Sequence, residues 1–157
     1  MNVINGASTK PFAFMAHYPG CGVGGHCIPV DPYYLIEYAK QNGFNHRFLS
    51  LAREINNQMP RFTVELVQEC LRAKNISLKG SKIAVLGLAY KPNVSDIRES
   101  PSLEIIKELQ KEEADVVVFD PFIKNESSVH NMKDALKDVK AVIIATCLLY
   151  TSPSPRD

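Results

Sequence analysis

Residues 81–109, SKIAVLGLAYKPNVSDIRESPSLEIIKEL, decide the fold of this chain. The apolar run Ile83–Leu86 ends at Gly87, which is typical of a strand buried on both faces of a parallel sheet. Ser100 followed by Pro101 predicts the start of a helix. The expected buried stripe of this helix consists of Leu103, Ile106 and Leu109. A strand followed by such a helix is the first half of a βαβ unit.

The segments that follow continue the alternation. Val116–Phe119 reads as a second strand that Asp120-Pro121 breaks, Met132–Lys137 as a short helix and Ala141–Ala145 as a third strand. This order predicts a parallel sheet with right-handed crossovers, so we expect an α/β fold in which a helical middle region precedes a partial Rossmann-like domain. Ligands bind such sheets at the carboxyl ends of the strands, which places residues 87–98 at the binding edge.

Upstream of the sheet the pattern is helical. We predict helices at Pro32–Asn42, His46–Asn56 and Pro60–Asn75, separated at Gly43 and before Pro60. The face expected to turn toward the core in the third helix consists of Val64, Val67, Cys70 and Leu71. The predicted division of the chain is an active-site loop with helical middle at 1–58, a connecting helix at 59–79, the sheet domain at 80–146 and a tail at 147–157.

The run Pro19–Pro29, PGCGVGGHCIP, is rich in glycine and carries a thiol near its end. Its glycines remove side chains that would keep a ligand away from the backbone. Asp31 followed by Pro32 predicts a helix that begins with Asp31 as its N-cap. Cys27 therefore precedes a helix N-terminus, whose dipole favours a thiolate. The pattern is typical of a nucleophile presented to a substrate.

Three other interpretations of these residues stay open at this point. A free cysteine is often a small buried hydrophobic residue. His17, Cys21, His26 and Cys27 lie close enough in sequence to suggest a metal site, but no second ligand pair follows at zinc-binding spacing. A disulfide between Cys21 and Cys27 is the third interpretation, although a chain with four cysteines and no signal peptide indicates a reducing compartment.

Two long motifs resemble one family. YPGCGVGGHCIPVDPYYL (18–35) is similar to the active-site loop of the UDP-glucose/GDP-mannose dehydrogenases, in the form of the branch that acts on UDP-N-acetylhexosamines. LGLAYKPNVSDIRESPS (86–102) resembles the start of the nucleotide-sugar-binding domain in the same family. The similarity runs from about Ala7 to about Thr146. It implies a four-electron oxidation of the sugar C6 alcohol to a carboxylate with two NAD+.

The resemblance assigns roles to single residues. Cys27 falls on the catalytic nucleophile, and Asp31 on an aspartate that orients catalytic groups or the attacking water. Lys91 falls on a substrate-binding lysine and Arg98 on an arginine that reaches the NAD side. The other implied substrate contacts are Gly24, Gly25 and Tyr90, with Tyr18 and Lys10 as weaker candidates. Without the resemblance, Lys91 and Arg98 read as solvated loop charges, Asp96 and Glu99 as residues that hold the loop together.

The hydrophobic content and net charge of the chain are consistent with part of an enzyme. The 157 residues are 45% hydrophobic and carry a net charge of +1, which leaves no basic footprint for nucleic acid or an anionic membrane. The first twelve residues, MNVINGASTKPF, lack the apolar core of a secretory signal, and no apolar run approaches the roughly 20 residues of a membrane span, so a cytoplasmic location is expected. The family implies a homodimer through residues about 32–74.

Departures from the family pattern shape the remaining expectations. Cys21 stands where the family loop carries proline, and the family's N-terminal NAD-binding domain and catalytic lysine have no counterpart here. We therefore expect the isolated chain to be inactive and poorly soluble. Residues 147–157, CLLYTSPSPRD, match nothing in the family and suggest a non-native tail, so Cys147 is given no role. Two alternatives are a UDP-glucose or GDP-mannose dehydrogenase and a nucleotide-sugar-binding module without catalysis.

Overall fold

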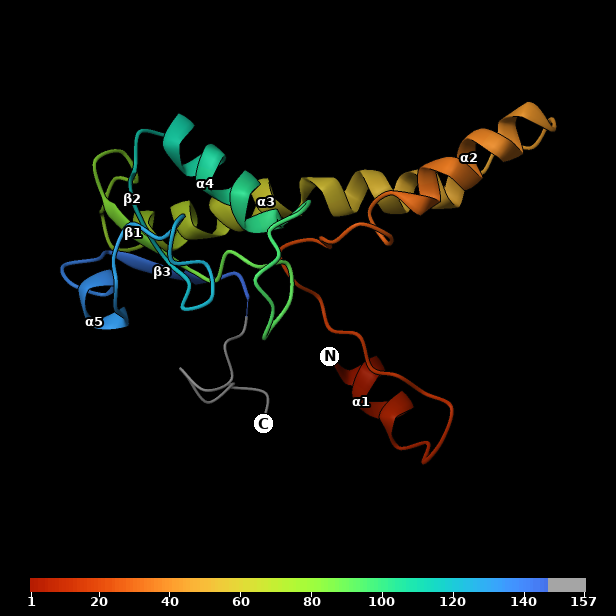
Figure 1. The fold of residues 1–157 in the computed structure, drawn as a ribbon, viewed down its shortest axis with the longest axis horizontal. Helices are drawn as coiled ribbons and strands as arrows, with labels where there is room; N and C mark the ends of the chain where they lie inside the picture. The colour runs from red at the N-terminus through yellow and green to blue at the C-terminus, as the bar shows by residue number, and fades with distance from the viewer. Residues whose placement is uncertain (147–157) are drawn as a thin grey trace.

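The computed structural model describes residues 1–146, so the predicted tail lies outside the described residues. Its elements, in chain order, are α1 (Asn2–Ser8), α2 (Asp31–Gln41), α3 (Arg47–Arg72), β1 (Lys82–Leu86), α4 (Pro101–Lys111), β2 (Asp115–Phe119), α5 (Met132–Ala135) and β3 (Ala141–Ile144). The predicted α/β fold is confirmed: a helical region precedes a small parallel sheet (Figure 1).

The sheet is parallel and has the strand order β2-β1-β3. Ile83 of the central strand lies opposite Val116 of β2 and Ala141 of β3. All three predicted strands are confirmed to within one residue at each end, whereas α5 ends at Ala135, two residues before the predicted end. The carboxyl ends of all three strands meet at one edge.

Alternate side chains of β1 enter two apolar cores. Ile83 and Val85 pack in a cluster with side chains of α3 and α4, whereas Ala84 and Leu86 pack on the other face with Ala135 of α5. In Figure 1 α3 and α4 accordingly lie on one side of the sheet and α5 on the other. Because both faces are covered, the strand reads as a continuous apolar run in the sequence.

The predicted stripe of α4 is partly wrong. Leu109 is fully buried as expected, but the other large buried side chain is Ile105, whereas Leu103 and Ile106 are only half-buried. Ser102, Ile105 and Leu109 stand at positions i, i+3 and i+7, so they share the helix face that meets the sheet. Leu103 and Ile106 flank that face.

The prediction of two helices before and after Pro60 is wrong, because α3 continues through this residue. Proline removes the N–H that would bond to the Asn56 carbonyl and crowds that carbonyl with its ring, which is buried here. The prediction that Cys70 belongs to the core is also wrong, since it is exposed. Successive helical residues are rotated by about 100°, which turns Cys70 away from the face that carries Val64 and Leu71.

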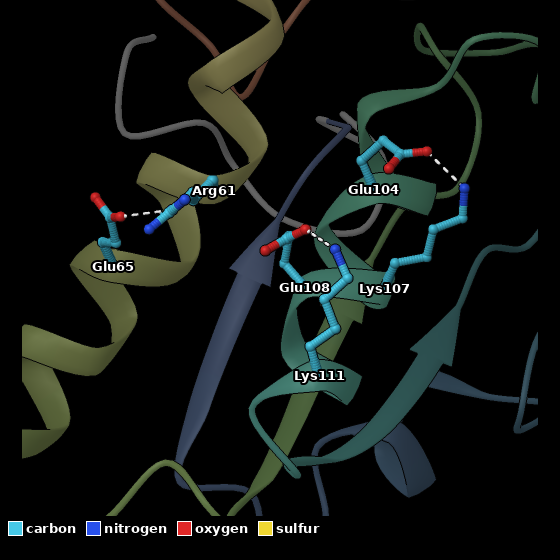
Figure 2. A network of polar contacts seen from close by, with 6 residues as sticks. All are labelled: Arg61, Glu65, Glu104, Lys107, Glu108 and Lys111. Atoms are coloured by element: carbon cyan, nitrogen blue, oxygen red, sulfur yellow. Dashed lines mark hydrogen bonds and ion pairs between the residues drawn. The ribbon is translucent and has the colours of Figure 1, made fainter.

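Solvent-exposed ion pairs run along α3 and α4. Figure 2 shows Arg61 with Glu65 on α3, and the pairs Glu104–Lys107 and Glu108–Lys111 on α4. Exposed pairs of this kind contribute little to stability. The α2–α3 hairpin extends away from the sheet, and α1 lies apart from both (Figure 1). Within residues 1–146 no helix has the length and apolarity that a membrane span requires.

Candidate active site

The two sequence motifs meet in space. We name residues 19–29 the cysteine loop and residues 87–100 the edge loop. The Gly25 N–H donates a hydrogen bond to the Arg98 carbonyl at 3.0 Å. A Cβ added at Gly24 would lie 2.6 Å from the Tyr90 Cβ and 2.7 Å from the Glu99 carbonyl oxygen. The cysteine loop is therefore pressed against the edge loop at a distance that only glycine allows.

Two other glycines of the cysteine loop are needed for their backbone geometry. Gly25 has φ +95°, and an added Cβ would lie 3.0 Å from the Tyr90 ring. Gly22 has φ +130° and faces the Pro101 ring, 3.0 Å from an added Cβ. Gly24 and Gly25, predicted to let a ligand approach, thus make room for Tyr90 itself; their contact with a ligand stays a prediction.

An asparagine of α3 holds the other side of the cysteine loop. The Asn56 side-chain oxygen accepts a hydrogen bond from the Val23 N–H at 3.1 Å. Its backbone carbonyl, which Pro60 leaves without a helical donor, lies 3.6 Å from the position of an added Gly22 Cβ. Our sequence reasoning missed Asn56. The signal was a pair of asparagines, poor helix formers, inside a helical pattern ahead of proline.

The edge loop is fixed by the ends of the neighbouring strands. The Asp120 carboxylate, only 1% exposed, accepts hydrogen bonds from the Leu88 and Ala89 N–H groups at 2.7 and 3.1 Å. On the β3 side the Thr146 hydroxyl donates to the Ala89 carbonyl. Gly87, at φ +91°, leaves no room for a Cβ beside Thr146. We had read Asp120 only as a strand breaker, and its role was missed.

This arrangement has a chemical consequence for phosphate binding. In dinucleotide-binding sheets the amides after the first strand bind the pyrophosphate. Here the Leu88 and Ala89 amides already bind the Asp120 carboxylate. They are not available to a phosphate, so a nucleotide at this edge must rely on the side chains of the loop, such as Lys91.

Replacing Asp120 with asparagine should lower the free energy of unfolding by about 2 kcal/mol, because the amide group leaves one buried N–H or oxygen without its partner. The second carboxylate oxygen already accepts from the Phe122 N–H at 2.8 Å, so no rotation of an asparagine satisfies all three donors. Urea denaturation measures the effect. Asp115→Asn, at the exposed start of β2, the strand that ends just before Asp120, is the matched control and should change stability little. Equal stability of both variants would show that the Asp120 carboxylate does not hold the edge loop through these hydrogen bonds.

The cations of the edge loop are exposed. The Lys91 ammonium lies 5.4 Å from the centroid of the Tyr90 ring. The Arg98 guanidinium binds Asp96 through Nε and Nη2, at 3.0 and 2.6 Å, and the Asp96 carbonyl accepts from the Tyr90 N–H at 3.1 Å. Asp96 thus holds the loop and engages two of the three guanidinium nitrogens of Arg98. Glu99 adopts φ +50° at the bend before α4.

The Asp96–Arg98 pair predicts a pH dependence. Hydrogen bonds from Arg98 lower the pKa of the Asp96 carboxyl from 3.8 to about 2. A carboxyl with a lower pKa in the folded state stabilises it above its unfolded pKa, and this contribution is lost as the pH falls toward 2. NMR titration of the Asp96 side-chain carbon should give a midpoint near 2, returning toward 3.8 in Arg98→Met. A wild-type midpoint near 3.8 would show that the pair does not form.

Cys27 is exposed and lies in the turn that starts α2. Its carbonyl accepts from the N–H groups of Val30 and Asp31 at 2.9 and 2.8 Å. The prediction that Asp31 is the N-cap is wrong: Val30 occupies that position with helical angles, because this turn already winds the chain, and Asp31 is the first helical residue. The pKa of Arg98 is raised, chiefly by Asp96 and to a smaller extent by Tyr90 and Cys27. Cys27 therefore lies within electrostatic reach of the edge loop.

The second thiol of the loop differs from the first. Cys21 is half-buried, its Sγ donates to the Ala145 carbonyl at 3.5 Å, and burial raises the pKa of its thiol. Cys21 stays protonated, whereas Cys27 is open to solvent. Both are free thiols, and residues 1–146 contain no group of three or more histidine, cysteine or acidic side chains placed to hold a metal.

Tyr18 is 44% exposed ahead of the loop, and its contact with substrate stays a prediction.

Comparison with known proteins matches both halves of this site. The UDP-glucose/GDP-mannose dehydrogenase family is matched by its central domain at residues 1–58 and by its UDP-binding domain at 84–148. The chain is 38% identical over 140 residues to the UDP-N-acetyl-D-mannosamine dehydrogenase of Pyrococcus horikoshii, covering 89% of this chain and 32% of that protein. It is 34% identical over 128 residues to the UDP-N-acetyl-D-glucosamine 6-dehydrogenase of Pseudomonas aeruginosa, covering 82% and 30%.

Solved structures agree. The Pyrococcus horikoshii UDP-D-ManNAc dehydrogenase superimposes with a TM-score of 0.82 at 36% identity, over 92% of this chain and 33% of that one. The NDP-N-acetyl-D-galactosaminuronic acid dehydrogenase of Methanosarcina mazei gives 0.85 at 27% identity, over 97% and 35%. A Rossmann-like sheet whose edge loop clamps a thiol-bearing loop places the chain among nucleotide-sugar dehydrogenase folds. It belongs to the UDP-glucose/GDP-mannose dehydrogenase family and spans about a third of the length of these relatives.

Proposed function

We propose that this chain is the substrate-side part of an enzyme that oxidises the C6 alcohol of a UDP-N-acetylhexosamine to the uronic acid. The main support for this proposal is the junction between the cysteine loop and the edge loop, which includes the Gly25–Arg98 hydrogen bond. This junction puts an exposed thiol beside the loop of a domain matched by the family's UDP-binding domain. The named relatives act on UDP-N-acetylated sugars, which supports this substrate class.

Cys27 has a defined part in such a reaction. The first oxidation converts the C6 alcohol to an aldehyde. The Cys27 thiolate adds to the aldehyde carbon, and the carbonyl oxygen takes up a proton to give a thiohemiacetal. This adduct still carries a C–H bond from which a hydride can leave, and loss of that hydride together with the hydroxyl proton yields a thioester. Water then attacks the thioester carbon, expels the thiolate and releases the carboxylic acid.

The neighbouring residues hold the substrate for these steps. Lys91 supplies the cation for the UDP phosphates, and Tyr90 lies beside the nucleotide sugar. Asp31, in the first turn of α2 after Cys27, orients the thiol or the attacking water. Tyr18, Gly24 and Gly25 complete the proposed substrate contacts.

NAD+, when bound, accepts the hydride of each oxidation. The Leu88 and Ala89 amides are taken by Asp120 and are not available to this cofactor. Arg98 is the residue we assign to the cofactor side. Its side chain is 63% exposed, and Asp96 occupies only Nε and Nη2, so Nη1 can reach a further acceptor.

Turnover tests the substrate class. A chimaera in which residues 7–146 replace the equivalent segment of the Pyrococcus horikoshii relative should form NADH with UDP-N-acetylglucosamine or UDP-N-acetylmannosamine. Faster turnover with UDP-glucose or GDP-mannose would instead indicate a UDP-glucose or GDP-mannose dehydrogenase. The unmodified relative and a thermal melt of the chimaera control for assembly.

A nucleotide-sugar-binding module without catalysis is a second candidate, favoured by the exposed Lys91 ammonium beside the half-buried Tyr90 ring. Under either proposal Lys91→Ala should weaken UDP binding to the 157-residue chain by roughly 10- to 100-fold, as expected for a lost charged hydrogen bond. Cys27→Ser should leave it unchanged. Isothermal titration measures both, and binding that is independent of Lys91 would contradict this assignment. Only the turnover assay separates the module from the enzyme.

We also propose that the α2–α3 hairpin forms a homodimer within residues 32–74. Its large exposed apolar side chains include Tyr34, Leu35, Tyr38, Phe48, Leu51 and Ile55. An apolar surface of this kind is typical of an interaction site. Phe48, 81% exposed, should be essential: Phe48→Asp is expected to convert the dimer to a monomer in light scattering after size exclusion. Val3→Asp, at an equally exposed apolar residue of α1, should leave the dimer intact; a monomeric wild type would refute the proposal.

A further inference from the structure

A cavity opens beside the cysteine loop. It has a volume of about 620 Å³ and opens between the start of α2, the middle of α3 and the N-terminus of α4. Gly22 and Val23 line it on one side of Cys27 in sequence, Pro29 and Val30 on the other. None of the residues assigned above to substrate, cofactor or catalysis lines this cavity.

A buried arginine forms part of its wall. Arg53 is 8% exposed, and its Nη1 and Nη2 groups donate to the side-chain oxygens of Asn56 and Asn57 at 3.3 and 2.8 Å. The guanidinium lies over the Tyr33 ring at 5.6 Å. Its Nε is buried and has no hydrogen-bond partner among residues 1–146, and no carboxylate of that range pairs with it. A buried cation with only neutral partners lacks its counter-charge.

A buried serine reaches the same cavity. Ser100 is 2% exposed, and its Oγ finds no hydrogen-bond partner within the described part of the chain. It is the N-cap of the eleven-residue helix α4, yet its side chain makes no capping bond. Since a helix N-terminus carries a partial positive charge, Ser100 adds a free hydroxyl at a point that favours an anion.

The acidic side chains of the wall do not supply the missing charge. Glu104 is bound to Lys107 at 2.6 Å on the exposed face of α4, as Figure 2 shows. Glu99 is exposed and lies at the bend before the helix. The buried part of the cavity is therefore positive, whereas its rim is mixed.

We propose that this cavity binds a small oxyanion, a phosphate or a carboxylate, that accepts hydrogen bonds from Arg53 Nε and Ser100 Oγ. Two buried unpartnered polar groups and an uncapped helix N-terminus then share one ligand. Because residues before and after Cys27 in sequence line the cavity, the bound anion steadies the cysteine loop. Tyr90 and Lys91, the part of the edge loop assigned to the nucleotide sugar, do not line this site, and the site does not depend on the proposed oxidation.

Thermal melts of the 157-residue chain test this proposal. The chain carries Lys91→Ala, which weakens any phosphate binding at the nucleotide edge. Inorganic phosphate and acetate are each titrated against sodium chloride of equal ionic strength. We expect one of them to raise the melting temperature by about 4 °C at ten times its dissociation constant. Arg53→Met should abolish the rise, whereas Arg61→Met, at an exposed arginine of the same helix, should retain it.

Anion binding can also be followed by NMR at the Arg53 Nε–H itself, and this measurement does not require a stable variant at the cavity. The Arg53 Nε–H signal in a 15N–1H spectrum should move on titration with the active anion and saturate. The identity of that anion separates a phosphoryl from a carboxylate ligand. An equal rise in melting temperature for all variants, or an Nε–H signal that moves no further than in sodium chloride, overturns the proposal. Stabilisation that depends on protein concentration alone would likewise overturn it, in favour of a group from a second copy.

Discussion

Serine at position 27 should reduce turnover of the chimaera by at least about 1,000-fold, as the loss of a nucleophile does in other enzymes of covalent mechanism. A serine hydroxyl is not ionised at neutral pH, so the aldehyde is not captured and the second oxidation stops. UDP affinity should remain unchanged, because Cys27 is exposed and contributes only backbone hydrogen bonds to the fold. Steady-state NADH formation measures the loss.

Cys21 is the matched control for this experiment. It is the other thiol of the cysteine loop, but it is half-buried, protonated and bonded to the Ala145 carbonyl. Cys21→Ser should therefore keep most of the activity. Comparable losses in both variants would mean that the loop tolerates no substitution, and that the effect at Cys27 is structural.

An alanine at Gly24 is expected to have the second largest effect. Its Cβ would lie 2.6 Å from the Tyr90 Cβ and 2.7 Å from a backbone oxygen of Glu99, and neither atom belongs to a flexible side-chain end. The two loops must separate, which should cost about 1–3 kcal/mol of folding free energy. Because Tyr90 and Lys91 share the displaced loop, UDP binding should fall as well.

Gly20 provides the comparison. It belongs to the same loop, but an added Cβ would meet no atom within 4 Å. Gly20→Ala should change neither the urea midpoint nor UDP affinity. If Gly24→Ala also left both unchanged, the contact between the cysteine loop and the edge loop would not exist in solution.

The fold was predictable where its signals are local. The apolar runs of β1, β2 and β3 and the Ser100-Pro101 helix start need no distant partner to be recognised. The errors concern tertiary packing. Proline at position 60 usually ends a helix, but here its ring is buried and α3 continues to Arg72.

The candidate site was predictable only in part for the same reason. Glycine spacing and the thiol marked the cysteine loop, and Lys91 and Arg98 marked the edge loop. The residues that hold them, Asp120 and Asn56, act through pairings 32 to 33 residues apart, which no local pattern reveals. Nor did the sequence indicate that Arg98 would be engaged by Asp96.

The central claim is that the thiol of Cys27 carries the second of two oxidations. Its most direct test is the number of NADH formed per UDP-N-acetylhexosamine consumed by the chimaera, with the sugar product identified by mass spectrometry. The account predicts two NADH and the uronic acid for the wild-type sequence, and strongly impaired formation of both in Cys27→Ser. One NADH with an aldehyde product, or undiminished double oxidation by the serine variant, would contradict it.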